Sequence, residues 1–294
     1  MMIEQFLNYL LLEKNNSEQT VRNYGLDLRL FESYFKKLDA RLSWESVDSD
    51  IIRDWMESMM DRGNNATSIN RRLSALRSFY RFALSRNLVG SDPAHGITGP
   101  KKSLALPRFV KDNEINSIID SFSEEDHTYN NMCARAILLM FYWTGMRVSE
   151  LISLDDSSVD IISCNVKVVG KGNKHRLVPF GGELKRCLNE YIAVRDACVE
   201  RMDNALFVTD KGKRMGYYRV RKLVDEHLSK VCTLGKKTPH VLRHSYATAM
   251  LNNGAGIESV KKLLGHSSVA TTEIYTHVTF EKLKEVYETA HPRS

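Results

Sequence analysis

Residues 238–275 read TPHVLRHSYATAMLNNGAGIESVKKLLGHSSVATTEIY, and the rest of the chain is organised around this stretch. Thr238 and Pro239 predict the start of a helix, because threonine suits the N-cap and proline suits the first helical position. The Asn-Asn-Gly at 252–254 should end that helix. A second helix is predicted over about 257–264, where the glycine that follows two leucines would form the C-terminal cap.

Four side chains in this stretch can act on a phosphate group. His240 and Arg243 are three residues apart, so the first predicted helix places them on one face. His266 comes directly after the glycine that ends the second helix, and Tyr275 lies nine residues further on, at the end of a polar segment. A basic cluster followed by one tyrosine predicts chemistry on a phosphodiester.

The composition is that of a soluble globular protein. The residues are 43% hydrophobic and 27% charged. A length of 294 residues is enough for one large domain or two ordinary ones. The formal net charge of +6 favours a nucleic acid as partner, since phosphates attract Lys and Arg. No stretch approaches the roughly 20 apolar residues of a membrane span, and the N-terminus lacks a signal-peptide pattern. We therefore expect a cytoplasmic protein with no membrane partner.

Neither a metal nor a cofactor is expected. The five cysteines form no CxxC pair, which predicts reduced thiols rather than a disulfide framework or a zinc site. His240 and His244 have the HxxxH spacing of a zinc site, but Arg243 beside them would repel a cation. No GxxxxGK[ST] loop for a nucleotide is present.

Residues 1–98 have the apolar periodicity of helices throughout. Four helices are predicted, beginning near Ile3, Ser17, Asp48, and Thr67 or Ser68. Short polar joints between them predict a small helical bundle, which we assign as an N-terminal domain.

Basic residues dominate the end of this domain and the segment that follows. Between residues 65 and 102 there are seven basic residues and one acidic residue, Asp92, which gives a net charge of +6. A solvated helix face is the ordinary explanation, but beside a phosphate site we prefer contact with the DNA backbone. The DNA-binding candidates are Arg71, Arg72, Arg77, Arg81, Lys101 and Lys102.

The segment 91–107 (SDPAHGITGPKKSLALP) holds three of the six prolines and predicts a domain boundary. We assign 99–107 as the linker and 108–294 as the second domain. There, 130–143 is apolar on nearly all sides and predicts a central helix, ended by Thr144-Gly145. The pattern then alternates, and 165–180 predicts a β-hairpin with its turn at Lys171–Lys174.

A phosphodiester can be cut without metal if the protein supplies a nucleophile, positive charge for the transition state and an acid for the leaving oxygen. Six residues could supply all three: Arg147, Lys171, His240, Arg243, His266 and Tyr275. Each has an ordinary alternative, such as an exposed arginine, a helix-capping histidine or one of 12 tyrosines. Lys174, on the same predicted turn as Lys171, is the second candidate for the acid.

Together these motifs resemble the tyrosine recombinase (phage integrase) family, and within it the compact Xer-type (XerC- and XerD-like) members. The matching segments are TGMRVSELISL around Arg147, GKGNKHRLVP around Lys171, HVLRHSYAT around His240 and Arg243, and LLGHSSVATTEIYTH around His266 and Tyr275. TVRNYGLDLRLF and INRRLSALRSFYRF are similar to the family's N-terminal domain. The resemblance therefore covers nearly the whole chain.

The resemblance implies a mainly α fold in two domains that form a C-shaped DNA clamp. The N-terminal part would be a four-helix SAM-like core-binding domain, and the second a mostly helical catalytic domain with a small antiparallel β-sheet. The implied activity is site-specific DNA recombination, in which strands are cut and rejoined through a 3′-phosphotyrosyl intermediate and a Holliday junction, without metal or ATP.

The same resemblance implies a role for each residue. Tyr275 would attack the scissile phosphate, while the two motif arginines and His266 would hold its non-bridging oxygens. Lys171 would protonate the leaving 5′-oxygen, and His240 would assist proton transfer near the nucleophile.

Double-stranded DNA at a specific recombination site is the expected substrate. A homo- or hetero-tetramer would assemble on it, in the second case with another Xer-type recombinase, and a DNA translocase is a further expected partner. Residues 279–294 repeat apolar residues at helical spacing. In Xer-type recombinases a terminal helix docks into the neighbouring protomer, and we expect the same here; packing on its own domain is the alternative.

Chromosome dimer resolution is the favoured role. The alternative with the same chemistry is the integrase or excisionase of a mobile element, which usually carries an extra N-terminal arm-binding domain that we do not expect here. A non-catalytic architectural DNA-binding protein is disfavoured because all six candidate catalytic residues are present. A topoisomerase is disfavoured because the N-terminal helices are similar to those of recombinases.

Overall fold

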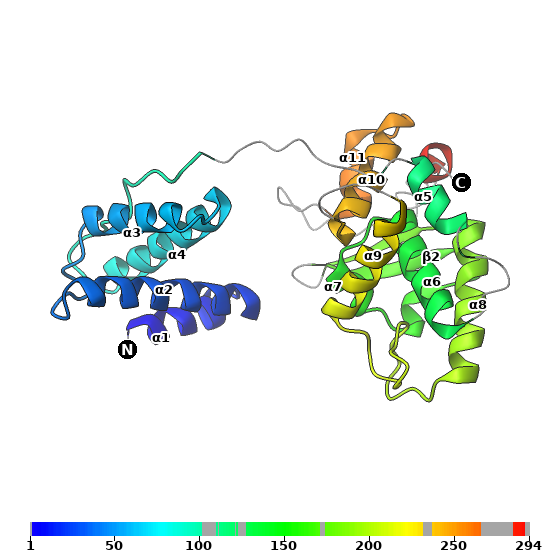
Figure 1. Cartoon of the computed structure of the whole chain (residues 1–294), viewed down its shortest axis with the longest axis horizontal. Coiled ribbons are helices and arrows are strands. Elements are labelled where there is room, and N and C mark those ends of the chain that lie inside the picture. The colour runs from blue at the N-terminus through cyan, green and yellow to red at the C-terminus, as the bar shows by residue number, and fades with distance from the viewer. Residues whose placement is uncertain are drawn as a thin grey trace. The chain divides into compact units, whose positions relative to one another are not determined.

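The computed structural model describes residues 2–101, 110, 112–120, 122, 128–170, 174–231, 237–265 and 285–291. The chain divides into two compact units, Met1–Ala105 and Leu106–Ser294 (Figure 1). Helices make up most of both units, and the second unit adds a small antiparallel sheet. The predicted mainly α fold is confirmed.

The N-terminal unit has the predicted helices. They are α1 (Met2–Asn8), continued by a short π-helix η1 (Tyr9–Glu13), then α2 (Glu18–Leu38), α3 (Ser49–Asp61) and α4 (Ala66–Ser85). Side-chain oxygens of Ser17, Asp48 and Asn65 accept backbone N–H groups at the starts of α2, α3 and α4. Because Asn65 is the cap, α4 begins one residue before the predicted Thr67.

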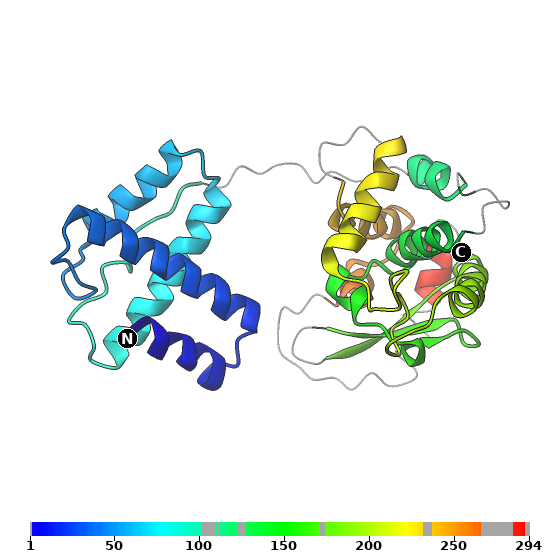
Figure 2. The same cartoon turned by 60° about the horizontal axis from the view of Figure 1, so that its bottom comes forward.

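Aromatic side chains form the core of this unit. Phe31 and Phe35 of α2 and Phe79 of α4 are fully buried. Trp44, which follows α2, packs its ring against all three. These contacts hold α2 where it crosses α4 (Figure 2).

The segment after α4 folds onto this unit as far as Pro100. Ala94 and Ile97 are buried in its core, and the Arg77 guanidinium donates to the carbonyl oxygens of both. Further along, the Asn70 side chain donates to the carbonyl of Pro100 at 2.8 Å. Residues 94–100 therefore belong structurally to the N-terminal unit, and they include Gly99 and Pro100, the first two residues of the segment assigned as the linker.

The second unit begins with helices and contains one sheet. Its elements are α5 (Asp112–Asp120), α6 (Tyr129–Thr144), α7 (Val148–Ile152), η2 (Asp156–Ser158), β1 (Val159–Asp160), β2 (Asn165–Val169), β3 (His175–Pro179), α8 (Gly182–Cys198), α9 (Tyr217–Val231), α10 (Pro239–Asn252) and α11 (Ile257–Leu264). The strands are antiparallel in the order β1-β2-β3, and the sheet lies at one edge of the helices (Figure 2). The predicted hairpin is confirmed as β2 and β3; β1 and α5 were not predicted.

α6 is the central helix, as predicted. Nearly every side chain from Met132 to Thr144 is buried, because α6 packs against both α8 and α10. The sheet contributes Val166 and Val178, which face each other across β2 and β3 and are fully buried. This core fixes the two ends of the site described below, the C-terminus of α6 and the start of α10.

Residues 285–291 pack on their own unit. The Tyr287 hydroxyl donates to the carbonyl of Trp143 at 2.9 Å, and the ring of His291 stacks on that of Trp143 with centroids 4.1 Å apart. Asn253 also donates to the carbonyl of Ala290. Within the single chain, residues 285–291 thus pack on their own unit, and contact of the 279–294 segment with a neighbouring protomer stays a prediction.

Two further observations concern the described part of the chain. No helix there is long and apolar enough to cross a bilayer. Its cysteines, Cys133, Cys164, Cys187 and Cys198, are free thiols. Cys232 lies outside the described residues.

Candidate active site

Arg147 lies on a tight turn between α6 and α7. Gly145 ends α6 in the left-handed conformation, with φ of +57°, and a Cβ at this position would overlap the ring of Tyr246. Arg147 is then the N-cap of α7, and its side chain is 35% exposed. The turn therefore presents a guanidinium that a phosphate can reach.

Arg243 joins this turn to the end of α11. It lies on α10 and is only 7% exposed. Its guanidinium donates to the carbonyl of Gly145 at 2.7 Å and to the carbonyl of Leu264 at 2.6 Å. Burial and the nearby charge of Arg147 lower the pKa of Arg243 to about 10, so it remains a cation at neutral pH. The sequence prediction that these two arginines share one site agrees with this geometry.

A buried carboxylate and a third arginine complete the group. Glu150 on α7 is 3% exposed; it accepts the Arg147 backbone N–H at 2.7 Å and the Arg147 guanidinium at 2.8 Å. Arg176 on β3 donates to both Glu150 carboxylate oxygens at 2.9 Å. Burial alone would raise the pKa of Glu150, but the hydrogen bonds and charge of Arg176, with the hydrogen bonds from Arg147, outweigh it and lower the pKa.

We call Arg147, Glu150, Arg176 and Arg243 the arginine cluster. Three guanidinium groups and one ionised carboxylate give it a net charge of +2. In a low-dielectric surrounding this charge attracts an anion far more strongly than it would in water. Arg147 is the most exposed member of the cluster, so an anion reaches the cluster from the side of its guanidinium.

His240 is one helical turn before Arg243 on α10 and is therefore exposed to the same positive electrostatic potential. His240 is exposed to solvent on one side, yet the protein around its ring desolvates it, and this together with the positive charges of Arg243, His244 and Arg147 lowers its pKa. The ring is therefore neutral at pH 7, given an ordinary pKa of about 6.5. A neutral imidazole beside the arginines can accept a proton.

Three predicted catalytic residues, Lys171, His266 and Tyr275, lie outside the described residues. Lys174 is described: it is exposed, and its carbonyl accepts the N–H of Gly170 at 2.7 Å. The structure thus brings Arg147, His240 and Arg243 together and gives no geometry for the others, whose roles stay predictions.

Sequence reasoning missed Glu150 and Arg176, although each has a local signal. Glu150 is three residues after the N-cap Arg147, which is the spacing of a capping box. Arg176 stands two residues before Val178, so the alternation of β3 puts it on the buried face, where a charge needs a partner. What the sequence does not reveal is that these two residues are partners.

The predicted DNA-binding side chains of the N-terminal unit fall into two groups. Arg71 and Arg72 are paired with the buried Asp27, and Arg77 is held by backbone carbonyls as described above. Arg81 and Lys101 are exposed, and neither makes an ion pair with another described residue. Lys102 lies outside the described residues. DNA contact by these residues remains a prediction, and Arg81 and Lys101 are the candidates that are both exposed and without an ion-pair partner among the described residues.

Comparison with known families gives two matches that together span most of the chain. Residues 3–87 match the "Phage integrase, N-terminal SAM-like domain", and residues 108–282 match the "Phage integrase family". The second match includes every member of the arginine cluster and all six predicted catalytic residues.

Curated relatives are similar over the full length. The tyrosine recombinase XerC of Chlorobaculum parvum is 37% identical over 316 residues, covering 99% of this chain and 94% of that protein. The tyrosine recombinase XerD of Oceanobacillus iheyensis is 34% identical over 298 residues, covering 99% and 98%.

Solved structures share the fold. XerH recombinase bound to palindromic difH substrate, in a post-cleavage complex, superposes with a TM-score of 0.73 at 22% identity, over 96% of this chain and 83% of that one. The Tn1549 transposon integrase with circular intermediate DNA superposes with a TM-score of 0.72 at 16% identity, over 97% and 99%.

Proposed function

The chain belongs to the phage integrase family as a Xer-type site-specific tyrosine recombinase, and on this premise we propose how its residues divide the reaction. The Tyr275 hydroxyl oxygen attacks the scissile phosphorus, and the bond from phosphorus to the 5′-oxygen breaks. A 3′-phosphotyrosyl ester and a free 5′-hydroxyl result. The 5′-hydroxyl of a partner duplex then attacks that ester, and two such exchanges pass through a Holliday junction.

The observation that carries this proposal is the arginine cluster. A phosphodiester bears one negative charge, and its pentacoordinate transition state bears more. A net charge of +2 around Arg147 and Arg243 matches the transition state better than the ground state, which is the condition for catalysis. We assign Arg147 and Arg243, with His266, to the non-bridging oxygens.

Protons must also move as the ester forms. The nucleophile loses one, and His240, whose pKa is lowered, is suited to accept it near Arg243. The leaving 5′-oxygen gains one, which we assign to Lys171, with Lys174 as the second candidate. No metal or nucleotide is needed, because the ester bond to Tyr275 conserves the energy of the broken phosphodiester.

A nicked suicide substrate tests the nucleophile. Wild type, incubated with the substrate without metal, should give an SDS-resistant protein–DNA adduct, and Tyr275→Phe should bind the same DNA and give none. Tyr287→Phe is the matched control, because it removes a buried hydroxyl that only donates to Trp143 and should leave the adduct intact. An adduct with Tyr275→Phe would assign the wrong tyrosine.

We further propose a cytoplasmic enzyme that assembles as a tetramer on double-stranded DNA to resolve chromosome dimers. The similarity to proteins named XerC and XerD, at 34 to 37% identity over the full length, supports this role over that of a mobile-element integrase. Recombination of a plasmid carrying two candidate chromosomal sites, with and without a second Xer-type recombinase or a DNA translocase, tests it. Recombination only at the ends of a mobile element would favour the alternative.

A further inference from the structure

Arg176 has no role in the reaction as proposed above. Its guanidinium nevertheless makes more hydrogen bonds to the protein than those of Arg147 and Arg243, which do have roles. It is 7% exposed, and its guanidinium makes three hydrogen bonds. Two go to the carboxylate oxygens of Glu150 at 2.9 Å, and the third goes from Nε to the carbonyl of Leu263 at 2.8 Å. A planar guanidinium is suited to this bidentate geometry, and an ammonium is not.

These bonds connect three elements of the site. Arg176 lies on β3, Glu150 lies on α7 and holds both the backbone and the side chain of Arg147, and Leu263 lies at the end of α11. The neighbouring carbonyl, that of Leu264, accepts from Arg243. Both buried arginines therefore fix the same end of α11. Arg243 connects it to the turn that carries Arg147, and Arg176 connects it to the Glu150 carboxylate that holds Arg147.

The approach of Arg176 to the end of α11 is close, and the residue there is a glycine. Gly265 ends α11 with φ of +64°, and a Cβ there would lie 3.0 Å from Nη1 of Arg176. Because Arg176 is held at three points, it has little freedom to move away. The end of α11 and Arg176 are thus fitted to each other.

We propose that Arg176 is a positioning residue for DNA cleavage, which keeps Glu150 paired so that the Arg147 guanidinium stays available to the scissile phosphate. This inference rests on the proposed function. Without Arg176, Arg147 would be the one ion-pair partner left to the buried Glu150 carboxylate among the described residues, and the carboxylate would hold it more tightly. The arginine cluster would fall from a net charge of +2 to +1, and the transition state would lose stabilisation.

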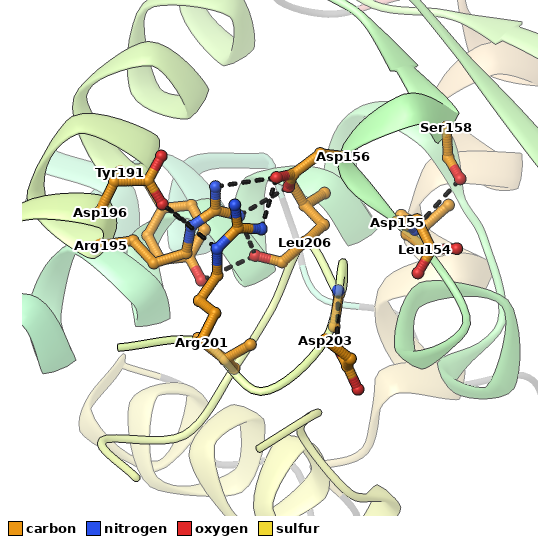
Figure 3. A network of polar contacts seen from close by, with 12 residues as sticks. Leu154, Asp155, Asp156, Ser158, Tyr191, Arg195, Asp196, Arg201, Asp203 and Leu206 are labelled. Atoms are coloured by element: carbon orange, nitrogen blue, oxygen red, sulfur yellow. Dashed lines mark hydrogen bonds and ion pairs between the residues drawn. The ribbon is translucent and has the colours of Figure 1, made fainter. Parts of the chain in front are cut away.

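The same unit contains a matched control for a purely structural arginine. Arg195 on α8 is 1% exposed, donates to both carboxylate oxygens of Asp156 at 2.7 and 3.1 Å, and donates to the carbonyl of Leu206 at 2.8 Å (Figure 3). It also pairs with Asp196. Arg195 and Arg176 thus have the same kind of partners, but the Arg195 network contains no member of the arginine cluster.

The experiment compares Arg176→Met with Arg195→Met in the full-length protein. DNA affinity, melting temperature and the single-turnover rate of adduct formation on a suicide substrate are measured, the rate at saturating DNA and per folded molecule. Both variants should lose melting temperature. Only Arg176→Met should cleave more slowly, by about 10- to 100-fold, which is the range for residues that orient the ligands of a metal site. Its DNA affinity should stay near that of wild type.

A second substitution separates positioning from simple loss of stability. In Arg176→Met with Glu150→Gln the cluster regains a net charge of +2, and the glutamine cannot capture Arg147 as an anion. This double variant should cleave faster than Arg176→Met alone, although it has lost one more buried interaction. Equal or slower cleavage by the double variant, or equal rates for Arg176→Met and Arg195→Met, would overturn the inference.

Two safeguards keep the outcomes distinct. If Arg176→Met does not fold, Arg176→Lys takes its place. This variant should cleave about tenfold more slowly than wild type, because its ammonium cannot hold both oxygens of Glu150 and the Leu263 carbonyl. Cleavage by Arg176→Lys at the wild-type rate would overturn the inference. Wild type and Tyr275→Phe are run beside every variant. Failure of wild type to form an adduct, or an adduct with Tyr275→Phe, would overturn the proposed function and this inference with it.

Discussion

At the scale of the residue, His240 is the group whose proton should set the pH dependence of cleavage. Its pKa is lowered from the ordinary value, by desolvation of the ring and then by the charges of Arg243, His244 and Arg147, so the neutral ring persists below pH 6.5. If this ring accepts a proton, single-turnover cleavage at saturating DNA should be constant near pH 7. It should fall as the pH drops through that lowered pKa.

Two variants on α10 check this assignment. His240→Gln cannot titrate, so its cleavage should be slower and should lose the acidic fall. His244→Gln, one residue beyond Arg243 and exposed, should keep the wild-type profile. A rate that instead falls as the pH rises through this range would make His240 a proton donor.

At the scale of the element, the end of α11 should tolerate no side chain. Gly265→Ala puts an alanine in the left-handed conformation, which costs about 1–2 kcal/mol. It also places a Cβ 3.0 Å from Nη1 of Arg176, whose guanidinium is held by three hydrogen bonds. We expect a loss of about 2–4 kcal/mol in the free energy of unfolding, measured by denaturant titration, and slower cleavage.

Gly254→Ala is the control for this prediction. Its φ is +88°, but nothing lies within 4 Å of an added Cβ, so only the backbone cost should appear and cleavage should be unaffected. Equal losses for the two variants would mean that Arg176 moves aside easily.

Elements were predictable where their signals are local. Thr238-Pro239 begins α10 and Gly265 ends α11 as predicted, because caps and turns depend on a few adjacent residues. β1, with two residues, is too short for periodicity to reveal. The pairing of Glu150 with Arg176 spans 26 positions, and only the folded chain brings the side chains of α7 and β3 together. For the same reason 91–107 is predicted as a boundary and 99–107 is assigned as the linker. The composition of this stretch is that of a loop, while Arg77 and the core hold residues 94–100 on the N-terminal unit.

At the scale of the whole molecule, the N-terminal unit should supply DNA affinity while the arginine cluster supplies rate. Arg81 and Lys101 are exposed and make no ion pair with another described residue, so each is free to neutralise a phosphate. In the double variant Arg81→Ala with Lys101→Ala, the slope of log affinity against log salt concentration should become shallower by about 2, one for each lost contact. Cleavage of saturating DNA should stay near the wild-type rate.

Arg86→Ala is the comparison within the same stretch, because Arg86 is exposed but paired with Glu13 at 2.8 Å. It should change the slope little, since its charge is already opposed within the unit. Comparing the two variants tests whether the net charge of +6 between residues 65 and 102 attracts DNA as a whole or only through the basic residues that have no ion-pair partner among the described residues. A slope unchanged in the double variant would remove Arg81 and Lys101 from the DNA interface and leave DNA affinity to the second unit.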